Sequence, residues 1–182
     1  MLEKTSFLIW LDLEMTGLDV RKDKIIEIAA IITDKNLEIV SKGISLVIMQ
    51  DKYLMDNMDA WNTNQHKKSG LYEKVLNSQI SCLDAENMIL KFLKKYLKRG
   101  ISPMCGNSIY QDRIFLRKYM PKLENFFHYR NIDVSTIKEL IKYWKPHYYD
   151  MLKKKNDHTA LTDIKESIKE LKFYKKILFE YK

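Results

Sequence analysis

Two carboxylates stand close together in an otherwise apolar segment near the N-terminus. The stretch FLIWLDLE covers residues 7–14, and Asp12 and Glu14 are its only charged side chains. The stretch is typical of a buried strand, in which alternate side chains share a face, so Asp12 and Glu14 point the same way. Neighbouring buried carboxylates repel each other and lose hydration. A divalent cation is the simplest partner that would offset both effects.

Two further carboxylates are candidates for the same site. Asp112 lies in a predicted helix over 108–120, and Asp163 lies in the first turns of the last predicted helix. Four carboxylates without a cysteine or histidine cluster favour hard cations such as Mg²⁺ or Mn²⁺. Two such ions suit phosphodiester hydrolysis, because one lowers the pKa of the attacking water and the other stabilises the leaving oxygen.

Each acidic residue taken alone also has an ordinary explanation. The pair Asp12 and Glu14 could form a solvated strand edge, Asp112 could pair with a neighbouring arginine, and Asp163 could complement its helix dipole. The five apolar residues before Asp12 argue against a solvated edge, because a surface pair does not need them.

His158 is the candidate general base. It precedes Asp163 by five residues, and five residues turn a helix by about 500°, which leaves the two side chains on different faces. His158 must therefore stand on the loop before the helix if both residues act at one site. A neutral imidazole there could take a proton from the attacking water, because its pKa lies near working pH. Taken alone, a loop histidine is more often simply solvent-exposed.

A mixed sheet with flanking helices would bring these side chains together. Apolar runs predict strands over 7–14, 25–34 and 38–48, joined by short connections into an antiparallel meander. The remaining pattern predicts helices over 55–68, from Ser81 to Gly100, over 108–120, over 136–145 with Ser135 as N-cap, and over 159–179. It also predicts two shorter strands, over 102–107 and 129–135, and a loop over 149–158. Strands that alternate with helices in this way indicate the α/β class.

The composition fits a single globular domain over residues 1–182. Hydrophobic residues make up 46% of the chain, which has only 5 Gly and 3 Pro, so long flexible linkers are not expected. No apolar run reaches the length of about 18 residues that a membrane span needs, and the first residues do not resemble a secretory signal. Cys82 and Cys105 form neither a disulfide framework nor a CxxC pair, which indicates a reduced, cytoplasmic protein.

The net charge of +8 permits two interpretations. A basic surface attracts an anionic partner such as nucleic acid. A general drift in composition would also enrich lysine, and the lysines are scattered along the chain instead of being massed in one arm.

Four segments together resemble a known enzyme family. They are DLEMTGL (12–18), GNSIYQDRIFLRKYMP (106–121), YRNIDVSTIKEL (129–140) and HTALTDIKESI (158–168). In order and spacing they are similar to the oligoribonucleases, in the DEDDh group of 3′-to-5′ exonucleases. The resemblance implies a ribonuclease H-like fold, two Mg²⁺ or Mn²⁺ ions held by the four carboxylates, and His158 as general base. It also implies hydrolysis of short single-stranded RNA, above all dinucleotides, to nucleoside 5′-monophosphates by a homodimer.

The resemblance further assigns positions at the 3′ end of the substrate. Leu18 matches an apolar wedge against the bases, and Trp61 and His66 match positions that line the 3′ end. Ordinary explanations exist for each: Leu18 could be core, Trp61 could fix a helix to the sheet, and His66 could lie on the surface.

Other positions match a cap on the 5′ phosphate. The resemblance assigns this cap to Ser108, Arg130 and Ser135, and gives Tyr129 a contact from the partner subunit. Without it, Ser135 could be only an N-cap, Arg130 a surface arginine and Tyr129 a strand aromatic. A closed cap would explain a length limit, because a longer RNA would have no space to continue.

The sequence also permits two other functions. One is a proofreading-type DNA exonuclease of the same fold, and the other is a non-catalytic module that binds nucleic acid. The acidic set together with His158 argues against the module, because binding alone does not require a buried cluster of like charges.

Overall fold

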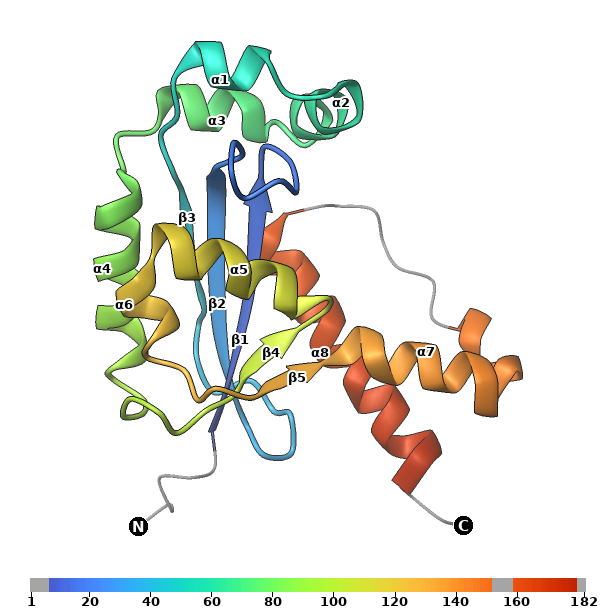
Figure 1. The fold of residues 1–182 in the computed structure, drawn as a ribbon. Coiled ribbons are helices and arrows are strands. Elements are labelled where there is room, and N and C mark those ends of the chain that lie inside the picture. Colours follow the sequence, from blue (N-terminus) through green and yellow to red (C-terminus); the bar gives the residue numbers. More distant parts are fainter. Residues whose placement is uncertain (1–6, 152–158, 180–182) are drawn as a thin grey trace.

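A five-stranded mixed sheet forms the centre of the computed structural model, which describes residues 7–151 and 159–179 (Figure 1). The strands are β1 (Phe7–Met15), β2 (Ile25–Asp34), β3 (Ile44–Val47), β4 (Met104–Gly106) and β5 (Asn131–Asp133), in the order β3-β2-β1-β4-β5. The pairs β1–β2 and β2–β3 are antiparallel, whereas β1–β4 and β4–β5 are parallel. The predicted α/β class and mixed sheet are confirmed.

Helices cover both faces of this sheet (Figure 1). They are α1 (Lys52–Asp56), α2 (Ala60–Lys68), α3 (Leu71–Asn77), α4 (Cys82–Leu93), α5 (Ile109–Tyr119), α6 (Pro121–Glu124), α7 (Val134–Trp144), the 3₁₀ helix η1 (Pro146–Met151) and α8 (Ala160–Phe179). Side chains of α4, α5 and α6 pack on one face of the sheet, and side chains of α7 and α8 pack on the other. None of the described helices is both long and apolar enough to cross a membrane.

The alternation of β1 determines which face receives the carboxylates. Ile9 and Leu11 belong to the core beneath α4 and α5, whereas Trp10 belongs to the core beneath α7 and α8. Because side chains alternate along a strand, Asp12 and Glu14 continue the row of Trp10. They therefore point toward the face that α8 covers.

Several predicted boundaries in the first half of the chain are wrong. The third strand was expected over 38–48 but covers only Ile44–Val47, because the Ser41 hydroxyl accepts the N–H of Ile32 at 2.9 Å where a backbone carbonyl would have paired. The helix expected over 55–68 is two helices, since Asp59 caps a new helix by accepting the N–H of Asn62. Helix α3 was not predicted.

The second half departs less from expectation. Ser81 does begin a helix with a full capping box, but α4 ends at Leu93 and not near Gly100. Asp133, not Ser135, is the N-cap of α7 and accepts the N–H of Ser135. Helix α6 and the 3₁₀ helix η1 were not predicted, and η1 covers part of the expected loop over 149–158.

Candidate active site

Three of the predicted acidic residues meet at the end of β1. Asp12 and Glu14 lie on the face of β1 toward α8, and Asp163 lies in the first turn of α8. One carboxylate oxygen from each lies within 4.8 Å of the others. This is the separation expected of ligands that share a small cation.

Asp112 joins the cluster from α5. It is 6% exposed, and its Oδ1 accepts the backbone N–H of Leu13 at 2.9 Å, between the two strand carboxylates. The neighbouring Arg113 and Arg117 instead lie 3.6 Å from Glu124. The interpretation of Asp112 as a surface partner of an arginine is therefore wrong.

Burial, followed by like charges, dominates the electrostatics of the cluster. Burial, followed by the charges of Asp112 and Glu14, raises the pKa of Asp12 well above its usual range. Burial, followed by the charge of Asp163, raises the pKa of Glu14 to about 8. Burial also raises the pKa of Asp112 to about 8, although its backbone hydrogen bonds act the other way.

The donor set fits a divalent cation. Within residues 7–151 and 159–179, no lysine or arginine forms an ion pair with Asp12, Glu14 or Asp112. Among the described residues, these three carboxyl groups therefore gather oxygen donors without a paired lysine or arginine. Oxygen donors of this kind match Mg²⁺ or Mn²⁺, which prefer carboxylates and water.

Glu27 is a fifth acidic residue, which the sequence analysis did not single out. It lies opposite Glu14 on β2 and is 6% exposed. Its carboxylate accepts the Ser45 hydroxyl at 2.6 Å and the backbone N–H of Ala160 at 3.4 Å. Glu27 thus holds the first residue of α8 beside the sheet. Glu27 lies inside the apolar run IIEIAAII, so it shows the same pattern as Asp12, which is a carboxylate within an apolar strand.

The predicted general base, His158, lies outside the described residues. The helix that carries Asp163 begins at Ala160. Thr159 precedes it and accepts the N–H of Asp163 at 3.0 Å through its carbonyl.

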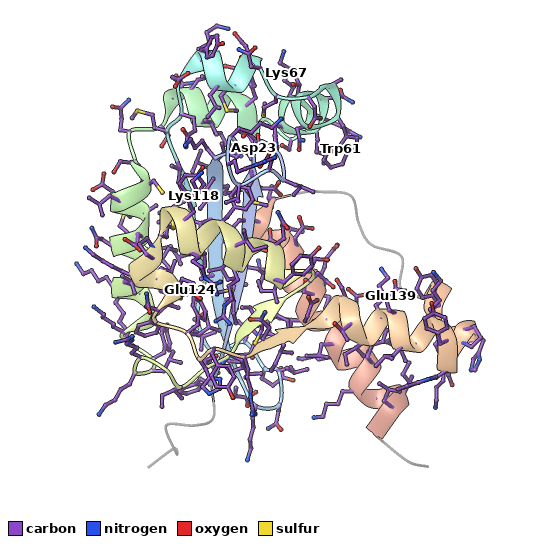
Figure 2. All side chains as sticks on the ribbon, viewed as in Figure 1. Asp23, Trp61, Lys67, Lys118, Glu124 and Glu139 are labelled. Carbon is purple, nitrogen blue, oxygen red and sulfur yellow. The ribbon has the colours of Figure 1, made fainter. Side chains whose placement is uncertain are left out.

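Leu18 and Trp61 are both solvent-exposed. Each side chain is 70% exposed. Leu18 is therefore not a core residue, and Trp61 does not pack its helix against the sheet. Trp61 projects from α2 (Figure 2). Large apolar side chains on the surface are suited to contact nucleobases.

The loop that carries Leu18 is held in place by several contacts. The Asp23 carboxylate accepts the Thr16 hydroxyl at 3.1 Å and the backbone N–H of Asp19 at 2.9 Å. From α5, the Gln111 side chain donates to the Leu18 carbonyl at 3.0 Å. Leu18 is therefore presented to solvent by a fixed loop (Asp23 is labelled in Figure 2).

His66 is buried, which contradicts its interpretation as a surface residue. It is 2% exposed, and its Nε2 lies 3.0 Å from the Met15 carbonyl. Since a carbonyl only accepts, Nε2 carries the proton and Nδ1 is an acceptor. Burial lowers the pKa of His66, which favours this neutral form.

The residues expected at the 5′ phosphate fall into two pairs. Ser108 and Ser135 lie side by side at the beginnings of α5 and α7, with their hydroxyl oxygens 3.2 Å apart. Arg130 instead contacts Tyr129, donating from Nε to its hydroxyl at 3.0 Å. Tyr129 precedes β5 and is 74% exposed, so it is not a strand aromatic.

Comparison with known proteins identifies the family. Residues 9–171 match the exonuclease family RNase_T. The oligoribonuclease of Ruthia magnifica subsp. Calyptogena magnifica is 54% identical over 176 residues, which cover 97% of this chain and 98% of that protein. The chain belongs to the oligoribonuclease family. The oligoribonuclease of Legionella pneumophila (strain Corby) is also 54% identical, over 92% of this chain and 90% of its own. Membership confirms the predicted family and the prediction of an exonuclease.

Solved structures support the fold of this oligoribonuclease family member. Exonuclease I from Methylocaldum szegediense matches with a TM-score of 0.69 at 14% identity, covering 96% of this chain and 41% of that one. E. coli exonuclease I in complex with a dT13 oligonucleotide matches with a TM-score of 0.71 at 14% identity, covering 93% of this chain and 41% of that one. The chain thus spans less than half of these larger exonucleases. The predicted ribonuclease H-like fold is confirmed.

Proposed function

We propose that the protein is a 3′-to-5′ exoribonuclease that hydrolyses short single-stranded RNA, above all dinucleotides, to nucleoside 5′-monophosphates. The observation that carries this proposal is the approach of Asp12, Glu14 and Asp163 to within 4.8 Å in a member of the oligoribonuclease family. The whole chain, residues 1–182, serves as one exonuclease domain in this proposal.

The four carboxylates would hold two divalent cations, Mg²⁺ or Mn²⁺. The chemistry that such ions supply is a lower pKa for the attacking water and neutralisation of charge on the leaving oxygen. Asp12 and Glu14 offer oxygens from a rigid strand, and Asp163 offers its oxygen from the helix that faces them. Asp112 is held in place by the Leu13 N–H, so its second oxygen remains available as a ligand.

His158 is the proposed general base. It would take a proton from the water as the water oxygen bonds to the phosphorus of the last phosphodiester. The bond from phosphorus to the 3′ oxygen of the preceding nucleotide then breaks, and that oxygen takes up a proton. The products are a nucleoside 5′-monophosphate and an RNA shorter by one nucleotide.

The two ends of a dinucleotide would be held separately. Leu18 and Trp61 would contact the bases, with support from their exposure of 70% each. His66 would act at the 3′ end from its buried position at the end of β1. Ser108, Ser135 and Arg130 would cap the 5′ phosphate, with the guanidinium moving away from Tyr129 to reach it.

Tyr129 would act across a homodimer. Its side chain is 74% exposed and would extend to the substrate of the partner subunit. The reduced cytoplasm is the proposed location, consistent with Cys82 and Cys105 both being free thiols.

A length series of RNA substrates tests the proposed function. Purified protein with Mn²⁺ is incubated with 5′-labelled RNAs of graded length, and with a long single-stranded DNA. The dinucleotide should be cleaved fastest, with rates falling as length increases. Equal rates on long and short RNA would contradict the cap, and preference for the long DNA would favour a proofreading-type exonuclease.

A further inference from the structure

Asn107 occupies a junction between three elements near the expected 5′-phosphate site. It follows β4, and its side chain lies between α7 and α8. Its Nδ2 donates to Ser167 Oγ at 2.7 Å and to Glu170 Oε2 at 3.1 Å, both on α8. Its Oδ1 accepts the Ser135 hydroxyl at 3.0 Å, on α7.

The orientation of the Asn107 amide follows from its partners. Glu170 accepts the Tyr174 hydroxyl at 2.7 Å and lies 3.7 Å from Lys138 Nζ, so it acts as an acceptor and the NH₂ group of Asn107 must face it. The carbonyl oxygen must then face Ser135. Ser167 and Glu170 are each 4% exposed, so the α8 side of this junction is shielded from solvent.

This orientation sets the direction of the hydroxyl pair. The single proton of the Ser135 hydroxyl points to Asn107, so toward Ser108 the Ser135 oxygen is an acceptor. It accepts the backbone N–H of Ser108 at 3.0 Å and lies 3.2 Å from the Ser108 hydroxyl. The Ser108 hydroxyl is thus the donor of the pair, and it can turn its proton to an incoming phosphate.

The same contacts hold an unusual backbone conformation. Ser108 has a φ of +49°, in the left-handed region that non-glycine residues seldom adopt. Its N–H is shared between the Ser135 hydroxyl and the Asp133 carboxylate, the latter at 2.9 Å. Such a conformation persists only where the surroundings enforce it.

The junction also reaches the acidic cluster. The Ser167 hydroxyl, which accepts from Asn107, donates to the Asp163 carbonyl at 2.8 Å. A continuous series of hydrogen bonds therefore runs from Ser135 through Asn107 to the first turn of α8. Helix α8 and the Ser108–Ser135 pair are thereby fixed relative to each other.

We infer that Asn107 is a positioning residue for recognition of a 5′ phosphate. It orients the Ser135 hydroxyl, which leaves the Ser108 hydroxyl as the donor to the phosphate, and it fixes the pair relative to the acidic cluster. This inference rests on the proposed function. Asn107 itself does not need to touch the substrate.

Kinetics on two dinucleotides test the inference. The substrates are the same diribonucleotide with a 5′ phosphate and with a free 5′ hydroxyl, and kcat and KM are measured for wild type and Asn107→Ala. The variant should raise KM for the phosphorylated substrate about tenfold, the effect of one weakened charge-assisted contact. It should leave KM for the hydroxyl substrate nearly unchanged, so that the preference for a 5′ phosphate shrinks.

Two further variants separate positioning from general damage. Asn77→Ala removes an exposed asparagine whose side chain donates to the Glu73 carbonyl on α3, and it should leave the kinetics on both substrates unchanged. Asn107→Asp keeps an oxygen toward Ser135 while placing a second one near Glu170. It should retain the 5′-phosphate preference even if its melting temperature falls.

Several outcomes would overturn the inference. Equal losses on both substrates in Asn107→Ala would indicate a purely structural role, and an unchanged preference would remove any role in phosphate recognition. If Asn107→Asp lost the preference for a 5′ phosphate, the side-chain oxygen that faces Ser135 could not be the cause of that preference. A wild-type enzyme that cleaves both dinucleotides equally well would show that there is no phosphate site to position. A wild-type protein that cleaves neither dinucleotide would instead contradict the proposed function itself.

Discussion

At the scale of single residues, the acidic cluster lowers the stability of the fold when no metal is bound. Asp12, Glu14 and Asp112 all have raised pKa values, with burial as the largest cause. These residues therefore destabilise the metal-free fold at a pH where they ionise. The conformation that suits a cation is maintained by the rest of the protein, as is usual where function opposes stability.

The raised pKa values predict how the stability of the metal-free protein depends on pH. Glu14 and Asp112 have pKa values of about 8 in the fold, against 4.5 and 3.8 for free side chains. Between these values the folded chain binds more protons than the unfolded chain, so stability falls as pH rises. In EDTA, the melting temperature should fall from about pH 5 to about pH 8.5. Added Mn²⁺ should raise it more at the higher pH, and a melting temperature that rises with pH in EDTA would contradict the raised pKa values.

Glu27 yields a second prediction at this scale. Glu27→Ala removes the acceptor for the Ala160 N–H and frees the beginning of α8 to move away from Glu14. We expect kcat on a diribonucleotide to fall at least about tenfold, because ligand geometry tolerates little displacement. Glu27→Gln keeps an acceptor oxygen and is the matched control, so its kcat should fall much less. Equal activity of Glu27→Ala and wild type would remove the positioning role.

The residue types predicted part of this site. The apolar segment before Asp12 correctly predicted a strand with a buried apolar core, whereas Asp12 and Glu14 themselves are only partly buried at its end. The sequence wrongly predicts an exposed His66, because its charged neighbours suggest a surface helix, whereas tertiary packing buries it against the end of β1. Ser135 was misjudged as an N-cap because Asp133, two residues earlier, serves as well locally. Glu27 could have been found by the reasoning applied to Asp12.

At the scale of elements, the close approach of β4 to β1 brings α5 to the cluster. Gly106 ends β4, and a Cβ atom there would lie 2.9 Å from the Leu11 carbonyl oxygen and 2.9 Å from Ile109 Cδ1. Any side chain would separate the two strands. Helix α5 begins three residues later, so the position of Asp112 depends on this contact.

Gly106→Ala is therefore expected to affect both stability and activity. The added methyl group should lower the free energy of unfolding by about 1–3 kcal/mol, as overpacking does, and should lower kcat by displacing Asp112. Urea denaturation and dinucleotide hydrolysis measure the two effects. Gly100→Asn is the control, because that site has a φ of +79° but no neighbouring atoms within 4 Å of a Cβ. Similar losses in both variants would argue against the packing explanation.

The sequence pattern predicted elements better than their ends. The strands β1 and β2 were found because long apolar runs leave few alternatives. The third strand was predicted too long because Ser41 and Gly43 break the pairing through a side-chain contact and a φ of +75°. The split between α1 and α2 depends on the Asp59 cap, which competes with a continuous helix and cannot be weighed from pattern alone.

At the scale of the whole molecule, the fold joins segments that are far apart in the chain. Asp12 and Asp163 are separated by most of the sequence, yet α8, near the C-terminus, packs against β1, the first strand of the chain (Figure 1). The order of the strands in the sheet and the contact of α8 with β1 are both set by tertiary packing. The resemblance to a family supplied this contact where local pattern could not.

The proposed homodimer is tested by complementation. Asp12→Ala and Tyr129→Ala should each be inactive alone, because each removes part of every site. Mixed subunits should recover about a quarter of wild-type activity, since half of the dimers are mixed and each has one intact site. Sedimentation verifies the dimer. No recovery on mixing, or a fully active monomer, would contradict a shared site.

The most direct measurement is hydrolysis of a diribonucleotide by wild type and Asp12→Asn, each with Mn²⁺ and with EDTA. Asp12→Asn keeps the shape of the side chain but removes one charge from the cluster, and circular dichroism confirms that it folds. We predict that wild type requires Mn²⁺ and that Asp12→Asn lowers kcat by about a thousandfold or more. Wild-type activity in EDTA, or an Asp12→Asn variant within about tenfold of wild type, would contradict a metal-dependent role for the carboxylate cluster.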